Sequence, residues 1–149
     1  MTLAQLLFAA VLLIFPNTPS RACLMAHQAS IEADITRSST TYSVPAGLLV
    51  SVAFNETHLG CDRGSGGCWG APIDAQHRHT AGNSDSAARV LRTGYDRCHN
   101  SWRGSVSRFR CGLCACPEQH AGYVNRVLSL SRRLYTQAGQ PIPFGLQGE

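Results

Sequence analysis

The apolar residues of this chain recur at helical spacing, which predicts a series of helices separated by polar loops. The predicted helices cover about residues 27–37, 45–60, 83–95, 102–109 and 122–138. Pro45 suits the first turn of its helix because a missing N–H costs nothing there, and Asn83 suits the cap of the next helix. No segment alternates between apolar and polar residues as a strand would, so the predicted fold class is all-α.

The helical periodicity disappears between Cys61 and Gly82, a segment that contains four glycines before Pro72. This composition predicts a long loop between the second and third helices. Long loops inside compact domains tend to carry function. We therefore expect part of a functional site to lie in this segment.

Residues 1–22 have the layout of a secretory signal peptide. Leu3 to Phe15 form an apolar run that is shorter than the ~20 residues needed to span a bilayer. Ser20 and Ala22 place small residues at the −3 and −1 positions of a cleavage site. Met1-Thr2 carries no positive side chain, which leaves an uncleaved anchor or an incorrectly assigned start as alternatives. We expect an exported protein, in the periplasm or cell envelope or secreted, without a stable membrane span after cleavage.

The rest of the chain divides into one domain over 23–140 and a Pro/Gly-rich tail over 141–149 that we expect to be loose. The chain is 44% hydrophobic and 15% charged, which favours a packed core over disorder. Its formal net charge is +4, and all 13 basic residues are arginines. This modest excess suits an acidic partner such as a cell-wall polymer. No dense basic run points to nucleic acid, and we expect a monomer.

Seven cysteines in a small exported domain predict a disulfide framework with one cysteine left over. Cys23 would become the mature N-terminus, where it could be lipidated, free or bridged to another chain. The other six can form three bridges, and their connectivity is open. Cys61 and Cys68 are a natural local pair, and Cys98 is expected to reach the 111–116 cluster. That cluster and His77-x-His79 have ligand-like spacings, but we expect no metal and no cofactor.

Glu56 is the candidate for acid–base chemistry. Leu48, Val52 and Glu56 are four residues apart and share one helix face, which Leu49 and Ala53 widen into an apolar stripe. A carboxyl group that ends such a stripe, just before a glycine-rich loop, lies where a core meets a cleft. There it can act as the proton donor that cleavage of a glycosidic bond needs. The alternative is a solvent-facing or helix-capping glutamate.

Four segments, in order, resemble the soluble lytic transglycosylase family. Tyr42 to Leu49 with Asn55-Glu56-Thr57-His58-Leu59 resembles the family's catalytic helix, and Ser65 to Gly70 resembles its glycine loop. The segments 102–112 and 123–127 are similar to the family's closing segment and closing helix. The resemblance covers roughly residues 31–135. It implies a lysozyme-like α fold in which Glu56 is the single catalytic residue, first as acid and then as base.

The resemblance also implies substrate-binding residues at Thr57, Gly70 and Tyr123, and the apolar ring of Trp69 in the glycine loop is a further candidate. Trp69 would stack on a sugar ring, although it could instead cover the loop between Cys61 and Cys68. Two family patterns are missing. Ala71-Pro72-Ile73 replaces Leu-Met-Gln, and Phe109-Arg110-Cys111-Gly112 replaces Tyr-Asn-x-Gly. Gln76 is close enough in sequence to substitute for the lost glutamine.

The resulting expectation is a peptidoglycan lytic transglycosylase that cleaves the MurNAc–GlcNAc β-1,4 bond and leaves 1,6-anhydromuramic acid ends. This agrees with the absence of a recognisable second carboxylate, for which Asp62 and Asp74 are the nearest candidates in sequence. Two alternatives remain. One is a lysozyme-type hydrolase of the same fold. The other is an inactive peptidoglycan-binding or secretion-system accessory protein.

Overall fold

The computed structural model describes residues 1–61, 68–79 and 82–148. These residues form six α-helices and two short 3₁₀ helices, so the predicted all-α class is confirmed for the described part of the chain. An isolated bridge between Ile73 and His79 is the only β pairing there. The elements are α1 (Leu3–Ile14), α2 (Arg21–Tyr42), α3 (Ala46–Thr57), α4 (Ser84–Arg97), α5 (Trp102–Cys111), η1 (Glu118–His120), α6 (Ala121–Gln137) and η2 (Phe144–Leu146).

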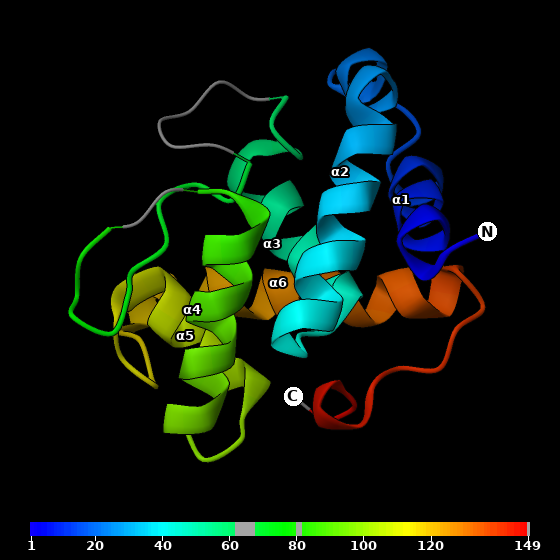
Figure 1. The fold of residues 1–149 in the computed structure, drawn as a ribbon. Coiled ribbons are helices and arrows are strands. Elements are labelled where there is room, and N and C mark those ends of the chain that lie inside the picture. The colour runs from blue at the N-terminus through cyan, green and yellow to red at the C-terminus, as the bar shows by residue number, and fades with distance from the viewer. Residues whose placement is uncertain (62–67, 80–81, 149) are drawn as a thin grey trace.

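Helix α3 lies at the centre of the molecule, with α1 and α2 on one side and α4 and α5 on the other (Figure 1). It contacts α1, α2, α4 and α6. Every residue from Ala46 to Phe54 is buried, because α3 is apolar on all its faces. Ser51 is the one polar residue in this stretch, and its hydroxyl donates to the Val127 carbonyl at 2.6 Å. The other polar side chains of α3, Glu56 among them, lie at its C-terminal end.

Helix α1 contains the apolar run of the predicted signal peptide and packs into the same core. Leu7, Phe8 and Val11 are fully buried against α2, α3 and α6. The predicted cleavage point after Ala22 falls in the first turn of α2. Cleavage itself stays a prediction. In the described residues, no helix combines the length and the hydrophobicity that a membrane crossing requires.

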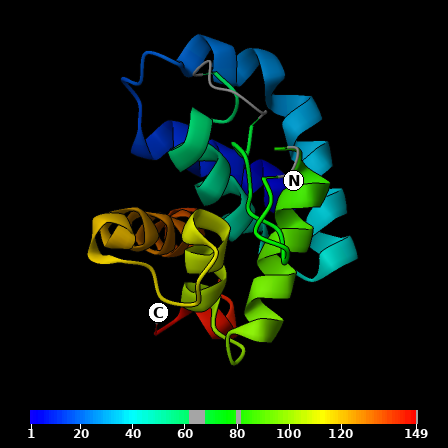
Figure 2. The same cartoon turned by 90° about the vertical axis from the view of Figure 1, so that its left-hand side faces the viewer.

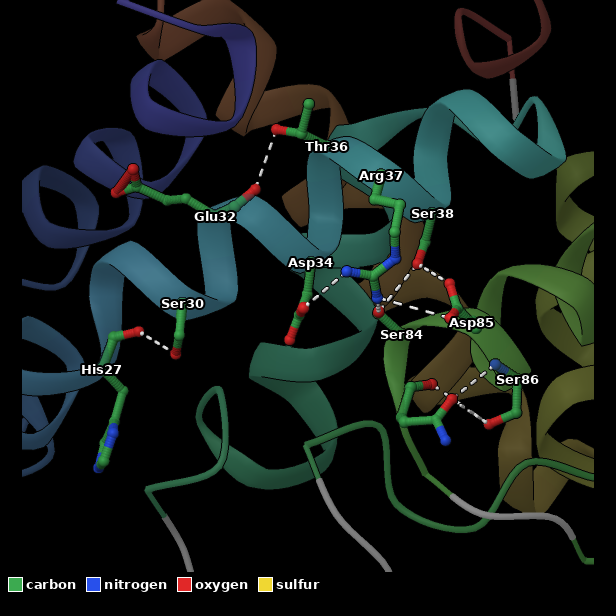
Figure 3. Close-up of polar contacts among 11 residues, drawn as sticks. His27, Ser30, Glu32, Asp34, Thr36, Arg37, Ser38, Ser84, Asp85 and Ser86 are labelled. Atoms are coloured by element: carbon green, nitrogen blue, oxygen red, sulfur yellow. Dashed lines mark hydrogen bonds and ion pairs between the residues drawn. The ribbon is translucent and has the colours of Figure 1, made fainter.

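A polar cluster joins the N-terminus of α4 to α2 (Figure 3). The Ser38 hydroxyl donates to Asp85 Oδ1 at 2.6 Å, and Arg37 forms an ion pair with the same carboxylate at 3.5 Å. Hydrogen bonding to Ser38, followed by the charge of Arg37, lowers the pKa of Asp85. The predicted cap is confirmed, since the Asn83 side chain accepts from the Ser86 N–H at 2.8 Å. These contacts fix where the loop that precedes α4 ends.

The disulfides correct two of the expectations. Cys23, expected to be lipidated, free or bridged to another chain, pairs with Cys61, so the local Cys61–Cys68 pair is wrong. The start of α2 lies beside the segment that follows α3, because these helices form a hairpin with a short connection. Cys98 pairs with Cys114, as expected for its reach into the 111–116 cluster.

Cys111 pairs with Cys116, so all three cysteines that could have held zinc are in disulfides. Cys68 keeps a free thiol, and burial raises its pKa. The three disulfides are compatible with an exported protein.

The C-terminal tail, which we expected to be loose, contributes to the core. The turn η2 places the Leu146 side chain in the core, where it is fully buried. The neighbouring Phe144 is 93% exposed. Leu146 is the only leucine in the tail, and the surrounding Pro and Gly residues hide its anchoring role in the sequence.

The substitution Leu146→Ala should lower the free energy of unfolding by about 2–4 kcal/mol, because it removes buried methyl groups and leaves a cavity. Urea denaturation measures this change. Phe144→Ala is the matched control in the same turn and should change stability by less than about 0.5 kcal/mol. Equal effects of the two substitutions would contradict the docking of the tail.

Replacing Cys98 and Cys114 together by Ala should cost about 3 kcal/mol, because their bridge closes a loop with a sequence separation of 16. Chemical denaturation without reductant measures the loss. Cys68→Ser removes the free thiol and is the control, with an expected change of less than about 1 kcal/mol. A large loss for Cys68→Ser, with none for the double variant, would mean that the pairing differs.

Candidate active site

Glu56 lies in the last turn of α3, one residue before the helix ends. The chain reverses immediately after it. His58 adopts a left-handed conformation (φ 48°), and its N–H donates to the carbonyls of Ala53 and Phe54. This sharp end lets the following loop return towards the face of α3 that carries Glu56. The side chain is therefore half-buried, between the apolar core and a cavity.

The cavity beside Glu56 has a volume of about 320 Å³, near the lower end of the range for small-molecule sites. Three parts of the chain form it: the end of α3, the described part of the loop, and α5. Its lining residues are Glu56, Thr57, Gly70, Ala71, His79, Phe109 and Arg110. Figure 2 shows the loop running between α3 and α4.

A buried tyrosine on α6 holds the Glu56 carboxylate. The Tyr123 hydroxyl donates to Glu56 Oε1 at 2.7 Å, and Tyr123 is only 4% exposed. Burial, then the nearby charge of Glu56 and the hydrogen bond to it, raise the pKa of Tyr123 well above its usual value near 10. The hydroxyl therefore keeps its proton and remains a donor to Oε1, while Oε2 is left on the side of Gly70.

Two glycines allow the loop backbone to approach the carboxylate. Gly70 has a φ of +68°, and a Cβ on it would lie only 2.8 Å from Glu56 Oε2. A Cβ on Gly82 would collide with the Gly70 carbonyl, and the Trp69 N–H donates to the Gly82 carbonyl at 3.0 Å. The absence of side chains at these two positions thus sets the distance between the loop and the carboxylate.

Arg110 supplies a positive charge to this cavity. Its guanidinium lies over the ring of Tyr123, 4.5 Å from the centroid, and its Nε donates to His120 Nδ1 at 3.4 Å. His79 also lines the cavity, and its Nδ1 lies 2.9 Å from the Ala71 carbonyl oxygen. We did not predict these two roles from the sequence. The only available signal was the departure of Phe109-Arg110 from the family pattern.

Three of the predicted substrate-binding residues lie beside Glu56: Thr57, Gly70 and Tyr123. The Thr57 hydroxyl is engaged within the protein, since it donates to the Cys68 carbonyl at 2.6 Å and accepts from the Gly60 N–H at 2.7 Å. It orders the loop. Thr57 therefore shapes the cavity wall rather than offering a free hydroxyl.

Two predicted substrate-binding residues lie elsewhere. Trp69, expected to stack on a sugar, is 2% exposed and donates from its indole N–H to the Leu49 carbonyl at 2.8 Å. It is a core residue, because the return of the loop turns its ring onto α3. Gln76 lines a different cavity and so does not replace the lost glutamine beside Glu56.

Glu56 is the only carboxylate among the described residues that line its cavity. Asp74 lines the same separate cavity as Gln76. Asp62, the other candidate for a second carboxylate, lies outside the described residues, as do Ser65, Gly66 and Gly67 of the glycine-loop resemblance. Among the described residues, the Glu56 cavity thus contains one carboxyl group. Tyr123 orients it, and Arg110 lies in the same cavity.

Comparisons with family models, curated proteins and solved structures found no match for this chain.

Removal of the Tyr123 hydroxyl should change how stability depends on pH. The folded protein raises the pKa of Tyr123, so ionisation of the unfolded chain above about pH 10 destabilises the wild type. The stability advantage of wild type over Tyr123→Phe should therefore be constant below about pH 9 and should fall as the pH rises above 10. Urea denaturation across this range measures it. An advantage that stays constant or grows would be inconsistent with a buried, neutral Tyr123.

Proposed function

We propose that this chain is a peptidoglycan lytic transglycosylase in which Glu56 acts first as acid and then as base. The observation that carries the proposal is the Glu56 carboxyl group itself. It borders a cavity, Tyr123 orients it, and no other carboxylate among the described residues lines that cavity. A glycosidase that uses two carboxylates needs a partner within about 5–10 Å. A single-carboxylate reaction fits this arrangement better.

The lysozyme-like fold and the exported location are part of the same proposal. The helical order, the central α3 that ends in Glu56 and the loop that returns over it agree with the motif order of the family. The three disulfides and the N-terminal sequence agree with export to the periplasm, the cell envelope or the medium.

The proposed reaction begins with protonated Glu56. It donates its proton to the oxygen between the MurNAc and GlcNAc rings as the bond from the anomeric carbon to that oxygen breaks. The carboxylate then accepts the proton of the MurNAc 6-hydroxyl as this oxygen bonds to the anomeric carbon. Glu56 returns to its protonated form, the product has a 1,6-anhydro end, and no water is consumed.

The neighbours of Glu56 suit both halves of this cycle. Tyr123 holds Oε1 and leaves Oε2 to carry the transferred proton. Arg110, whose guanidinium lies over the Tyr123 ring, places a positive charge at the edge of the same cavity.

One observation favours a second candidate function, an inactive wall-binding or secretion-system accessory protein. No side-chain amide lines the described Glu56 cavity, and Gln76 does not supply one. A site without these groups binds the sugar acetamido and hydroxyl groups less specifically. Retention of the scaffold for binding would then explain why the family patterns have changed beside an intact Glu56.

Mass spectrometry of products from purified peptidoglycan tests the proposal. The wild-type protein should release anhydro-ended muropeptides, and Glu56→Gln should reduce the rate by about 10²–10⁴-fold, because it removes the general acid. The matched control is Glu118→Gln, which alters an exposed glutamate in η1 and should leave the rate unchanged.

Other products would change the assignment. Reducing-end products that depend on Glu56 would identify the lysozyme-type hydrolase. Absence of any product from correctly disulfide-bonded wild-type protein would favour the accessory function.

A further inference from the structure

A second cavity, with a volume of about 330 Å³, is lined by residues between Ile73 and Arg78, in the same loop whose Ala71 and His79 line the Glu56 cavity. Three arginines from three parts of the chain line it: Arg78 from the loop, Arg89 from α4 and Arg108 from α5. Three guanidinium groups around one small cavity repel each other unless negative charge compensates them.

One of these charges is compensated within the protein. Asp74 forms an ion pair with Arg78 at 3.2 Å and accepts from the backbone N–H groups of Gln76 and Arg78 at 2.9 and 3.0 Å. The backbone hydrogen bond from Arg78 is the largest of the effects that lower the pKa of Asp74, so the carboxylate is ionised at neutral pH. Asp74 is the only acidic residue among the described lining residues.

The guanidinium groups of Arg89 and Arg108 have no hydrogen bond or ion pair with any described residue. Arg89 is exposed and Arg108 is half-buried, so both remain accessible from the cavity. Thr93 and Gln76 add a hydroxyl and an amide as uncharged donors. Two free guanidinium groups with neutral donors beside them suit a carboxylate or a phosphate, because both present two oxygens to the planar fork of arginine.

The second cavity adjoins the Glu56 cavity through shared segments. Ala71 and His79 line the Glu56 cavity, whereas Ile73 and Arg78, their near neighbours in sequence, line the second. On α5, Arg108 lines the second cavity and Phe109 and Arg110 line the first. The two cavities are thus lined by near neighbours in the same loop and by consecutive residues of α5.

We propose that Arg89 and Arg108 form a binding site for a carboxylate of the peptide that branches from the glycan strand. This inference rests on the proposed function, which supplies the polymer. In this proposal, the 71–79 segment separates a site for the sugar from a site for its acidic branch.

Isothermal titration calorimetry at low ionic strength tests the site without any cleavage. The full-length protein carries Glu56→Gln, and the probes are muramyl dipeptide with free carboxylates, its fully amidated form and inorganic phosphate. Arg89→Gln and Arg108→Gln should each weaken binding of the free-acid dipeptide about tenfold, and amidation should have a similar effect. Arg97→Gln, on the exposed side of the same helix as Arg89 and outside the cavity, should change affinity less than about twofold.

Three results would overturn the proposal: equal affinity for the free and amidated dipeptides, no loss on substitution of Arg89, or arginine-dependent binding of phosphate with no contribution from the dipeptide carboxylates. Because Arg89 is exposed, its variant should stay folded, and an unchanged unfolding temperature verifies this. Absence of anhydro products with arginine-dependent dipeptide binding would contradict only the proposed reaction. Anhydro products without such binding would contradict only the carboxylate site.

Discussion

The burial of α3 on all its faces determines where this helix can carry a charged side chain. Helices α1, α2, α4 and α6 enclose it, and all its residues from Ala46 to Phe54 are buried. Only polar side chains at its C-terminal end are partly exposed. A carboxyl group can be accommodated only where that enclosure stops, and Glu56 is at this point. The left-handed turn at His58 then brings the loop back, so the boundary of the core becomes the wall of a cavity.

Two residues of the glycine-rich loop determine how closely its backbone approaches the Glu56 carboxyl group. Gly82 supports Gly70, Gly70 meets one oxygen of Glu56, and Tyr123 holds the other. The carboxyl group is therefore held from two directions by groups that belong to distant parts of the chain. Rigid positioning of this kind would lower the cost of reorganisation in the proton transfers proposed for Glu56.

Periodicity was sufficient to predict the helical class and the order of the helices after residue 22, because the apolar residues of these helices recur at helical spacing. The spacing of Leu48, Val52 and Glu56 also indicated correctly that Glu56 lies at the edge of the core. Local reasoning failed for Cys61, whose partner Cys23 is 38 residues away and becomes a neighbour only through the α2–α3 hairpin. It failed in the same way for Trp69, whose ring position depends on the path of the loop.

Gln76 illustrates a different limit. Its distance from Glu56 along the chain is short, but the bridge between Ile73 and His79 folds the segment so that Gln76 faces the opposite cavity. Arg110 could not be recognised because its role depends on contact with Tyr123 on another helix. Gln76 and Arg110 depend on how separate elements meet and no motif marked their roles, whereas a motif at the start of its helix marked Tyr123.

The disulfides at the end of α5 connect the cavity to the redox conditions of its surroundings. Cys111 directly follows Arg110, and its bridge to Cys116, together with the bridge from Cys114 to Cys98, fastens the chain just beyond the arginine. Reduction would release this end of α5 and, with it, the guanidinium above Tyr123. The order of the chain around Arg110 thus depends on two bridges that form and persist only under oxidising conditions.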